Sequence, residues 1–165
     1  MENIYSHKRT HISYKSLVSN LNTIGIFLLT LLWSYAVFAK FADLKLYQLQ
    51  MKEQPFPYSL QELLTYLIPI LELTAATLLI FNKHKWGLWL SLTLILGFTI
   101  YITLILTHVF PNAPCSCGGF ISKMSWKSHL YFNMLLFFIN IGCLIKIIKK
   151  ERRLSVKEQK YNSKN

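Results

Sequence analysis

Long runs of apolar residues, separated by short polar segments, dominate the pattern of this chain. The shortest runs have 19 residues, which as a helix reach about 28 Å and so cross a hydrocarbon core of about 30 Å. Because lipid offers the backbone no hydrogen-bond partners, each run should be helical. The pattern predicts an all-α, polytopic membrane protein, a bundle of four transmembrane helices at residues 21–39, 63–81, 86–110 and 130–148.

The connections and the two ends have patterns of their own. In residues 41–53, Phe41, Leu44, Tyr47 and Met51 fall near one helical face. This favours a short interfacial helix lying on the membrane after the first span, and a loop touching the bundle is the alternative. We expect a basic N-terminal segment at 1–20, one membrane domain at 21–148, and a basic, disordered tail at 149–165.

Composition and charge agree with a membrane protein. The chain is 53% hydrophobic, yet its formal net charge is +11. A soluble domain rarely combines the two, whereas apolar spans with basic ends do so readily. The basic residues flank the apolar runs and form no patch with interleaved aromatics, so we expect a lipid bilayer as partner and no nucleic acid.

The distribution of lysine and arginine predicts the orientation. Thirteen of the eighteen lie in the N-terminal segment, the 82–85 turn and the tail from Lys146 onward. Only five lie in the two longer connections, 40–62 and 111–129. The positive-inside rule then predicts a multi-pass protein of the bacterial inner (cytoplasmic) membrane, with both termini cytoplasmic and the longer connections periplasmic.

The connection between the last two runs contains the candidate chemistry. Cys115 and Cys117 are one residue apart, followed by Gly118 and Gly119. A disulfide across one intervening residue closes a strained ring, which raises its reduction potential, and the glycines permit the backbone angles that this requires. In an oxidising periplasm the pair is a candidate catalytic site for disulfide exchange with a thioredoxin-like or redox-enzyme partner.

Two other interpretations of the pair stay open. In the first, the cysteines only staple the loop. In the second, the two thiolates bind zinc or copper together with His108 and His129. The spacing of these four residues matches no standard template, so we favour disulfide exchange and expect no metal.

Glu72 lies at the centre of the second apolar run. A carboxylate there should face the bundle interior, as a proton acceptor, a polar anchor for a quinone, or an interhelical hydrogen-bonding group that fixes packing. Because nothing near it in sequence supplies a second titrating group, the packing interpretation is slightly favoured.

Polar residues also recur at helical spacing in the last two runs. Each set falls on one helical face, and each ends in a histidine next to the cysteines. An imidazole there can lower a thiol pKa or relay a proton, while interhelical packing is the plainer alternative. The sets are Thr93, Gly97, Tyr101 and His108 in the third run, and His129, Asn133 and Asn140 in the fourth.

Three segments together resemble the MauE/DoxX-like family of four-helix membrane proteins. Residues 34–43 resemble the family's Ser-Gly-x-x-Lys-x-x-Asp pattern, with Tyr35 in place of the usual glycine. Pro69 and Glu72 are similar to its Pro-x-x-Glu motif, and residues 115–119 resemble the cysteine turn of its redox-associated, MauE-type members. The likeness covers roughly residues 20–148.

The resemblance implies a role in methylamine utilisation or a related pathway, in which MauE-type proteins help form disulfides in, or mature, a periplasmic redox enzyme. The chain is also similar to four-helix disulfide-generating enzymes of the DsbB and vitamin K epoxide reductase type, which use two cysteine pairs and a quinone. Only one outward pair is present here, which favours electron relay to a partner and leaves a quinone as a candidate cofactor.

Two alternatives to a thiol-disulfide oxidoreductase remain. One is a non-enzymatic membrane subunit that anchors or assembles a redox enzyme, and the less favoured one is a metal-handling or transport protein.

Overall fold

The computed structural model describes residues 2–109 and 125–163, with the side chains of the first helix described from Asn20 onward. Within these residues all regular structure is helical. The helices are α1 (Glu2–Ala42), α2 (Leu44–Lys52), α3 (Tyr58–Ile80), α4 (His84–Leu106) and α5 (Trp126–Asn162).

Four of these helices are long and apolar enough to cross a membrane. They are the Asn20–Ala42 part of α1, together with α3, α4 and α5. Large apolar side chains such as Phe27, Phe38, Ile70 and Phe138 remain exposed on their outer faces. Lipid tails can cover such a surface, whereas water would leave it unstable. The prediction of an all-α, four-span membrane protein is confirmed.

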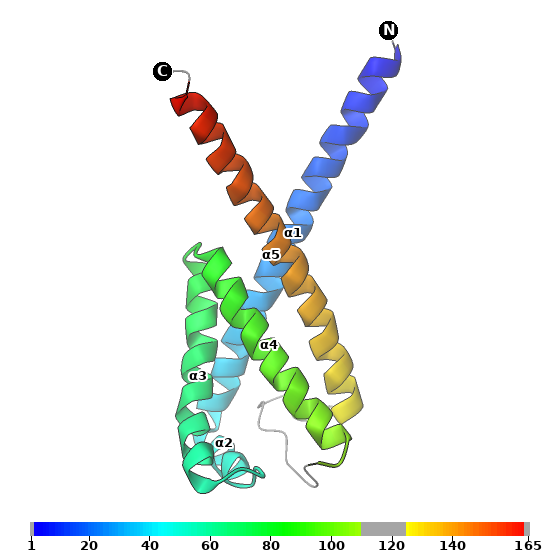
Figure 1. The fold of residues 1–165 in the computed structure, drawn as a ribbon. Coiled ribbons are helices and arrows are strands. Elements are labelled where there is room, and N and C mark those ends of the chain that lie inside the picture. The colour runs from blue at the N-terminus through cyan, green and yellow to red at the C-terminus, as the bar shows by residue number, and fades with distance from the viewer. Residues whose placement is uncertain (1, 110–124, 164–165) are drawn as a thin grey trace.

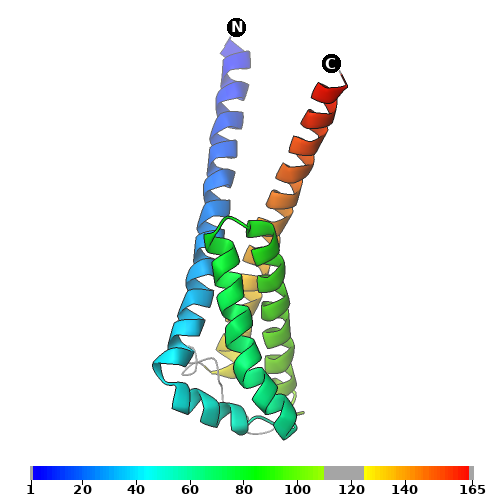
Figure 2. The same ribbon diagram turned by 90° about the vertical axis from the view of Figure 1, so that its left-hand side faces the viewer.

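Both termini and the short α3–α4 turn lie at one end of the bundle, and α2 lies at the other (Figure 1). The end of α4 and the beginning of α5 are at the α2 end, as the view rotated by 90° also shows (Figure 2). Below, this end is called the α2 end. An even number of spans therefore returns the chain to its starting side.

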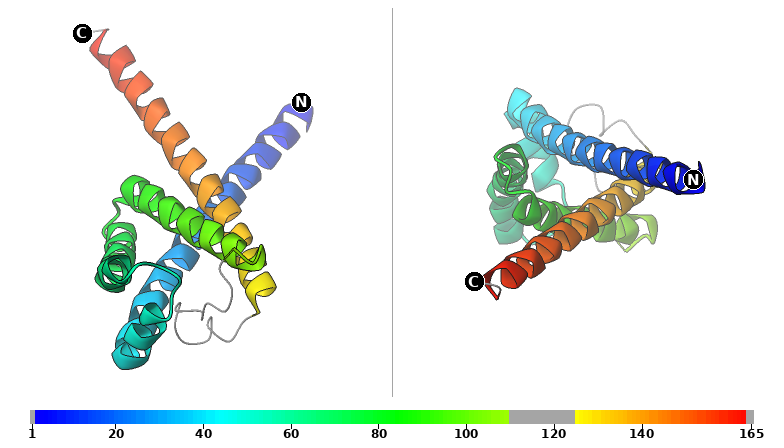
Figure 3. Two further views of the ribbon diagram at one scale, coloured as in Figure 1. Left: turned by 60° about the horizontal axis from the view of Figure 1, so that its bottom comes forward. Right: turned by 90° about the horizontal axis from the view of Figure 1, so that it is seen from above.

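The bundle core forms where the four spans meet. α1 packs against α3 and α5, and α4 packs against α3 and α5. The left view of Figure 3 shows α1 and α5 crossing one another. Residues at the centre are almost fully buried, among them Leu29, Trp33, Ala75, Leu79, Leu88, Ile95, Leu136 and Leu144.

The helices α3 and α4 end in the same way, with one residue in the left-handed backbone region. Asn82 has φ 59° and His108 has φ 58°. The Lys83 N–H donates to the Leu78 carbonyl at 2.9 Å, and the Val109 N–H donates to the Leu104 carbonyl at 3.1 Å. These are Schellman caps, which satisfy carbonyls left free at a helix end. The cap at Asn82 lets α4 start immediately after α3.

The short helix predicted after the first span is present as α2, so the alternative of a loop is wrong. Asp43 caps it by accepting a hydrogen bond from the Leu46 N–H at 3.0 Å. Tyr47 and Met51 are buried against the bundle, while Leu44 remains exposed. Its position at the membrane surface remains a prediction.

The C-terminal tail differs from its expectation. We expected disorder from residue 149, but α5 continues to Asn162 with its side chains exposed. The segment contains no proline or glycine and is rich in lysine, arginine and glutamate, all good helix formers. Lys85 pairs with Glu151 at 2.7 Å. Both groups are about half exposed, so this pair contributes at most about 1 kcal/mol.

Candidate functional site

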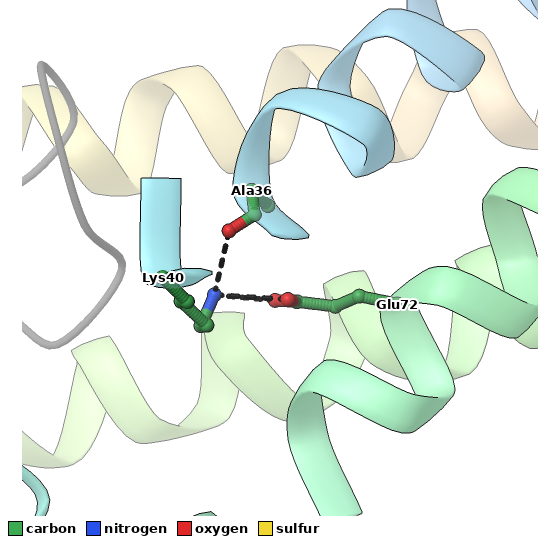
Figure 4. Close-up of polar contacts among 3 residues, drawn as sticks. All are labelled: Ala36, Lys40 and Glu72. Atoms are coloured by element: carbon green, nitrogen blue, oxygen red, sulfur yellow. Dashed lines mark hydrogen bonds and ion pairs between the residues drawn. The ribbon is translucent and has the colours of Figure 1, made fainter. Parts of the chain in front are cut away.

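A buried ion pair joins the last turn of α1 to the middle of α3. Lys40 Nζ lies 2.9 Å from both carboxylate oxygens of Glu72 and 3.5 Å from the Ala36 carbonyl oxygen (Figure 4). Both side chains are 2% exposed. Two charges held in apolar surroundings stabilise one another only while both are present, and removing one leaves the other buried without compensation.

Lys40 reaches Glu72 because it continues the buried face of α1. Leu29, Trp33, Ala36 and Lys40 follow one another at helical spacings of four, three and four, and all four are buried. The ammonium of Lys40 also lies 5.8 Å from the ring centroid of Tyr47, which α2 contributes. Thus α1, α2 and α3 all surround the lysine.

A cavity of about 40 Å³ lies beside the ion pair. Its polar lining comes from three different spans and its apolar lining from aromatic and aliphatic side chains. The polar residues are Lys40, Glu72, His129 and Asn133, and the apolar ones include Trp33, Ile95, Phe98, Phe132 and Leu136. The structure therefore brings together three residues predicted from the sequence, Glu72, His129 and Asn133, and adds Lys40.

Asn133 faces this cavity with an unsatisfied donor. The residue is 7% exposed, and its Nδ2 atom has no hydrogen-bond partner among the described residues. Buried amides in proteins nearly always have a partner, which can be water. The cavity is where such a partner can bind.

Asn140, two turns further along α5, is fully satisfied by contrast. With its oxygen facing Ser91, it accepts from Ser91 Oγ at 2.7 Å and donates from Nδ2 to the Leu88 carbonyl at 3.2 Å. Ser91 Oγ in turn accepts from Trp33 Nε1 at 2.8 Å. One hydroxyl group on α4 thus links α1 to α5, which is the packing role that the sequence offered as the plainer interpretation.

His129 lies in the first turn of α5, one turn closer to the α2 end than Asn133. It is 4% exposed and stacks on Trp126 with ring centroids 6.4 Å apart. Ser125 caps this helix by accepting from the Ser128 N–H. The imidazole therefore lies between the cavity and the end of the bundle.

The polar set predicted on α4 does not line the cavity. Thr93 and Gly97 are exposed on its outer face, and His108 is exposed beyond the helix end. Tyr101 hydrogen-bonds to the side chain of Gln54, which tethers the segment after α2 to α4. Thr93, Gly97 and Tyr101 follow one another at helical spacing on α4, whereas the buried face of α4 is the one with Ser91 and Ile95.

Cys115, Cys117, Gly118 and Gly119 lie outside the described residues. Within the described part of the chain, no three histidine, cysteine or acidic side chains are grouped as a metal site requires. Cys143 is buried at the α1–α5 contact, with its Sγ 3.7 Å from the Asn22 carbonyl oxygen.

The cavity, as the described residues line it, does not fit a quinone. A benzene ring occupies a cavity of about 150 Å³, whereas this one has about 40 Å³. We therefore derive no step through a quinone.

Lys40 is the member of the buried ion pair that periodicity in the sequence did not identify, because it lies beyond the end of the predicted span at residue 39. Its helical register with Leu29, Trp33 and Ala36 is the signal that would have placed it in the interior.

Comparison with protein families identifies a family to which this chain is similar. The family model described as methylamine utilisation protein MauE matches residues 18–146. Comparisons with curated proteins and with solved structures give no significant match. The matched region includes the first three spans, most of the apolar part of the fourth, the ion pair, the cavity and the cysteine pair.

Proposed function

This chain belongs to the MauE family of methylamine utilisation proteins, and from that membership we propose that it is a thiol–disulfide redox protein. Cys115 and Cys117 exchange electrons with a partner protein on the outer side of a bacterial inner membrane. The partner is a thioredoxin-like protein or a redox enzyme that needs its own disulfides formed.

One observation carries this proposal. The last described residue before the cysteine connection, Val109, and the first one after it, Ser125, belong to helix ends at the α2 end, opposite both termini (Figure 2). The excess of lysine and arginine on the segments at the other end favours the cytoplasm for the termini. The α2 end then faces the oxidising compartment, where a Cys-x-Cys pair can cycle.

The exchange itself needs only the two proteins. The thiolate of Cys115 attacks a disulfide of the partner and forms a mixed disulfide, and one partner sulfur leaves as a thiolate. The thiolate of Cys117 then attacks the sulfur of Cys115, so the Cys115–Cys117 disulfide forms and the partner leaves as a dithiol. Two electrons move to the partner, and the two protons from the cysteines end on its thiols. The reverse sequence oxidises the partner.

The surrounding residues support this chemistry in different ways. His129, buried at the start of α5, is a candidate to hold a proton while a thiolate forms. Gly118 and Gly119 allow the backbone next to the cysteines to adopt φ angles that other residues disfavour. Glu72 joins α3 to α1 through Lys40, and Tyr101 joins α4 to the segment after α2 through Gln54, so that the connection starts and ends on a rigid frame.

Thiol labelling of intact cells tests the proposal. A membrane-impermeant maleimide should label Cys115 and Cys117 from outside after reduction and leave them unlabelled after oxidation. The matched control is Cys143→Ser, which should not change the labelling because Cys143 is buried. Labelling that is independent of redox state, or that occurs only from the cytoplasmic side, would contradict the proposal.

A paired variant separates exchange from mere anchoring. If Cys115→Ser with Cys117→Ser abolishes maturation of the partner enzyme at normal expression, the cysteines act chemically. If maturation is retained, the protein is a membrane subunit that anchors or assembles the enzyme, and the cysteines staple the loop.

A further inference from the structure

The cavity beside the ion pair has polar groups that the thiol chemistry leaves unused. Lys40 and Glu72 contribute opposite charges, and Asn133 contributes an amide nitrogen without a partner among the described residues. All three residues are more than nine-tenths buried. A site of this kind is built for a ligand that satisfies both an amide donor and a carboxylate.

The unpartnered donor gives the chemistry of that ligand. An amide N–H left buried without an acceptor costs about 1–3 kcal/mol. The ligand must therefore present an acceptor oxygen to Asn133 Nδ2. A carboxylate nearby requires that the same ligand also donate, because a second acceptor facing Glu72 would be repelled.

The size of the cavity identifies the ligand. A buried water needs about 10–15 Å³ in this measure, so the 40 Å³ available holds about three or four water molecules. Water both accepts and donates, which matches Asn133 and Glu72 together. The carbonyl oxygen of an apolar ring could accept from Asn133. The ring would not fit in the cavity, however, and a carbonyl has no donor for Glu72.

We propose that this cavity is an internal water site that connects Glu72 to the α2 end of the bundle and lets its carboxylate exchange protons. Water bridges Asn133 Nδ2 to Glu72, and His129 lies one turn nearer the end. A proton passes from water at the bundle end along this chain to a Glu72 oxygen. The Lys40 ammonium is then left without its counter-charge, so this state is short-lived and the reverse transfer restores the ion pair.

Few charged or titratable side chains lie near Glu72 among the described residues. Among the described residues that line the cavity or contact the pair, α1 contributes Lys40, α2 contributes Tyr47 and α5 contributes His129, while α4 contributes the apolar Ile95 and Phe98. This water site does not depend on the cysteines, so it survives if the thiol chemistry is disproved.

Radiolytic labelling of the full chain in lipid nanodiscs tests the proposal, with water itself as the probe. Hydroxyl radicals from internal water oxidise adjacent side chains, so Trp33, which is 3% exposed, should be labelled. Asn133→Leu should abolish that label, because it removes the donor and fills the cavity. Leu144→Ile, a buried change on α5 away from the cavity, is the matched control and should retain it.

Infrared spectroscopy provides the second measurement. At a pH low enough to protonate Glu72, the carboxyl C=O band that Glu72→Gln removes should shift rapidly on transfer into D₂O in the wild type and slowly in Asn133→Leu. An unlabelled Trp33 in the wild type, or equal labelling in Asn133→Leu, would overturn the proposal. A ring carbonyl compound that copurifies with the wild type and is lost from Asn133→Leu would also overturn it. The maleimide experiment on Cys115 and Cys117 is independent of all these outcomes.

Discussion

Lys40 and Glu72, 32 residues apart in sequence, meet in the bundle with both carboxylate oxygens 2.9 Å from the ammonium nitrogen. The pair connects the first span to the second in the bundle interior, where both side chains are only 2% exposed. The pair therefore stabilises the fold only when both residues are present, because either charge alone would be buried without a counter-charge.

Removing one member of this pair should be much worse than removing both. We expect Lys40→Met or Glu72→Leu alone to lower the free energy of unfolding by about 3–5 kcal/mol. The double variant should return to within about 1 kcal/mol of the wild type or exceed it, because no isolated charge is left. Thermal unfolding in detergent, followed by tryptophan fluorescence, measures all three. Equal losses in the single and double variants would show that the pair is not coupled.

The hydroxyl group of Ser91 should be important out of proportion to its size. Ser91→Ala removes an acceptor from Trp33 Nε1 and a donor from Asn140, so two buried groups lose a partner. We expect a loss of about 1–3 kcal/mol for each group left unsatisfied, with a change in the emission of Trp33.

The control for Ser91 is on the same helix. Thr93→Ala removes a hydroxyl that bonds only to the Trp89 carbonyl of its own helix and is exposed. Its effect should stay within about 0.5 kcal/mol. A Thr93 variant as damaging as the Ser91 variant would contradict the network.

How much of this could be predicted depends on which physical signal each feature leaves in the sequence. Four spans follow from hydropathy alone, because a bilayer demands about 20 apolar residues wherever it is crossed. The burial of Glu72 also follows, since a carboxylate in a span must face inward. Its partner did not follow, because pairing between helices depends on how they rotate and cross, which no local pattern encodes.

Residues 149–162, the helical arm of α5, were expected to be disordered but form a helix. A polar and basic composition suggests disorder when judged by hydrophobicity. Helix propensity and continuity with a stable span act in the other direction, because a preformed helix extends without a nucleation cost. On α4, helical spacing of polar residues also marks a face that is largely exposed. Threonine hydroxyls bond back to their own helix, as Thr93 does, and need no interior partner.

Gly25 should resist any side chain, because side chains of α5 pack directly against it. A Cβ atom at Gly25 would lie 2.6 Å from Cys143 Sγ and 3.2 Å from Ile139 Cγ2. Gly25→Ala should therefore cost about 1–3 kcal/mol, and Cys143→Ala in the same chain should recover much of it by removing the sulfur. Gly97→Ala and Gly142→Ala are matched controls, since a Cβ there meets nothing within 4 Å.

Those two controls should be neutral or stabilising by about 0.4–1 kcal/mol, because alanine restricts the unfolded chain more than glycine. Retention of full stability by Gly25→Ala, or failure of the Cys143 change to rescue it, would mean that the helices do not approach as closely as this contact requires.

The basic arm of α5 should set the orientation of the whole bundle. Eight of the thirteen lysines and arginines assigned to the cytoplasmic side lie from Lys146 onward, so without them the two sides would carry five each. Replacing these eight residues with glutamine should give a mixture of orientations, because the positive-inside bias disappears. Reporter fusions at the C-terminus, one active only in the periplasm and one only in the cytoplasm, measure the mixture.

Acidic residues of the same arm provide the control for orientation. Glu151→Gln with Glu158→Gln changes the net charge but not the count of lysine and arginine, and acidic groups contribute little to topology. The orientation should therefore stay as in the wild type. A uniform orientation after loss of all eight basic residues would instead show that the first span and the Asn82 turn fix the topology. In that case the side on which the α2 end lies would no longer depend on the tail.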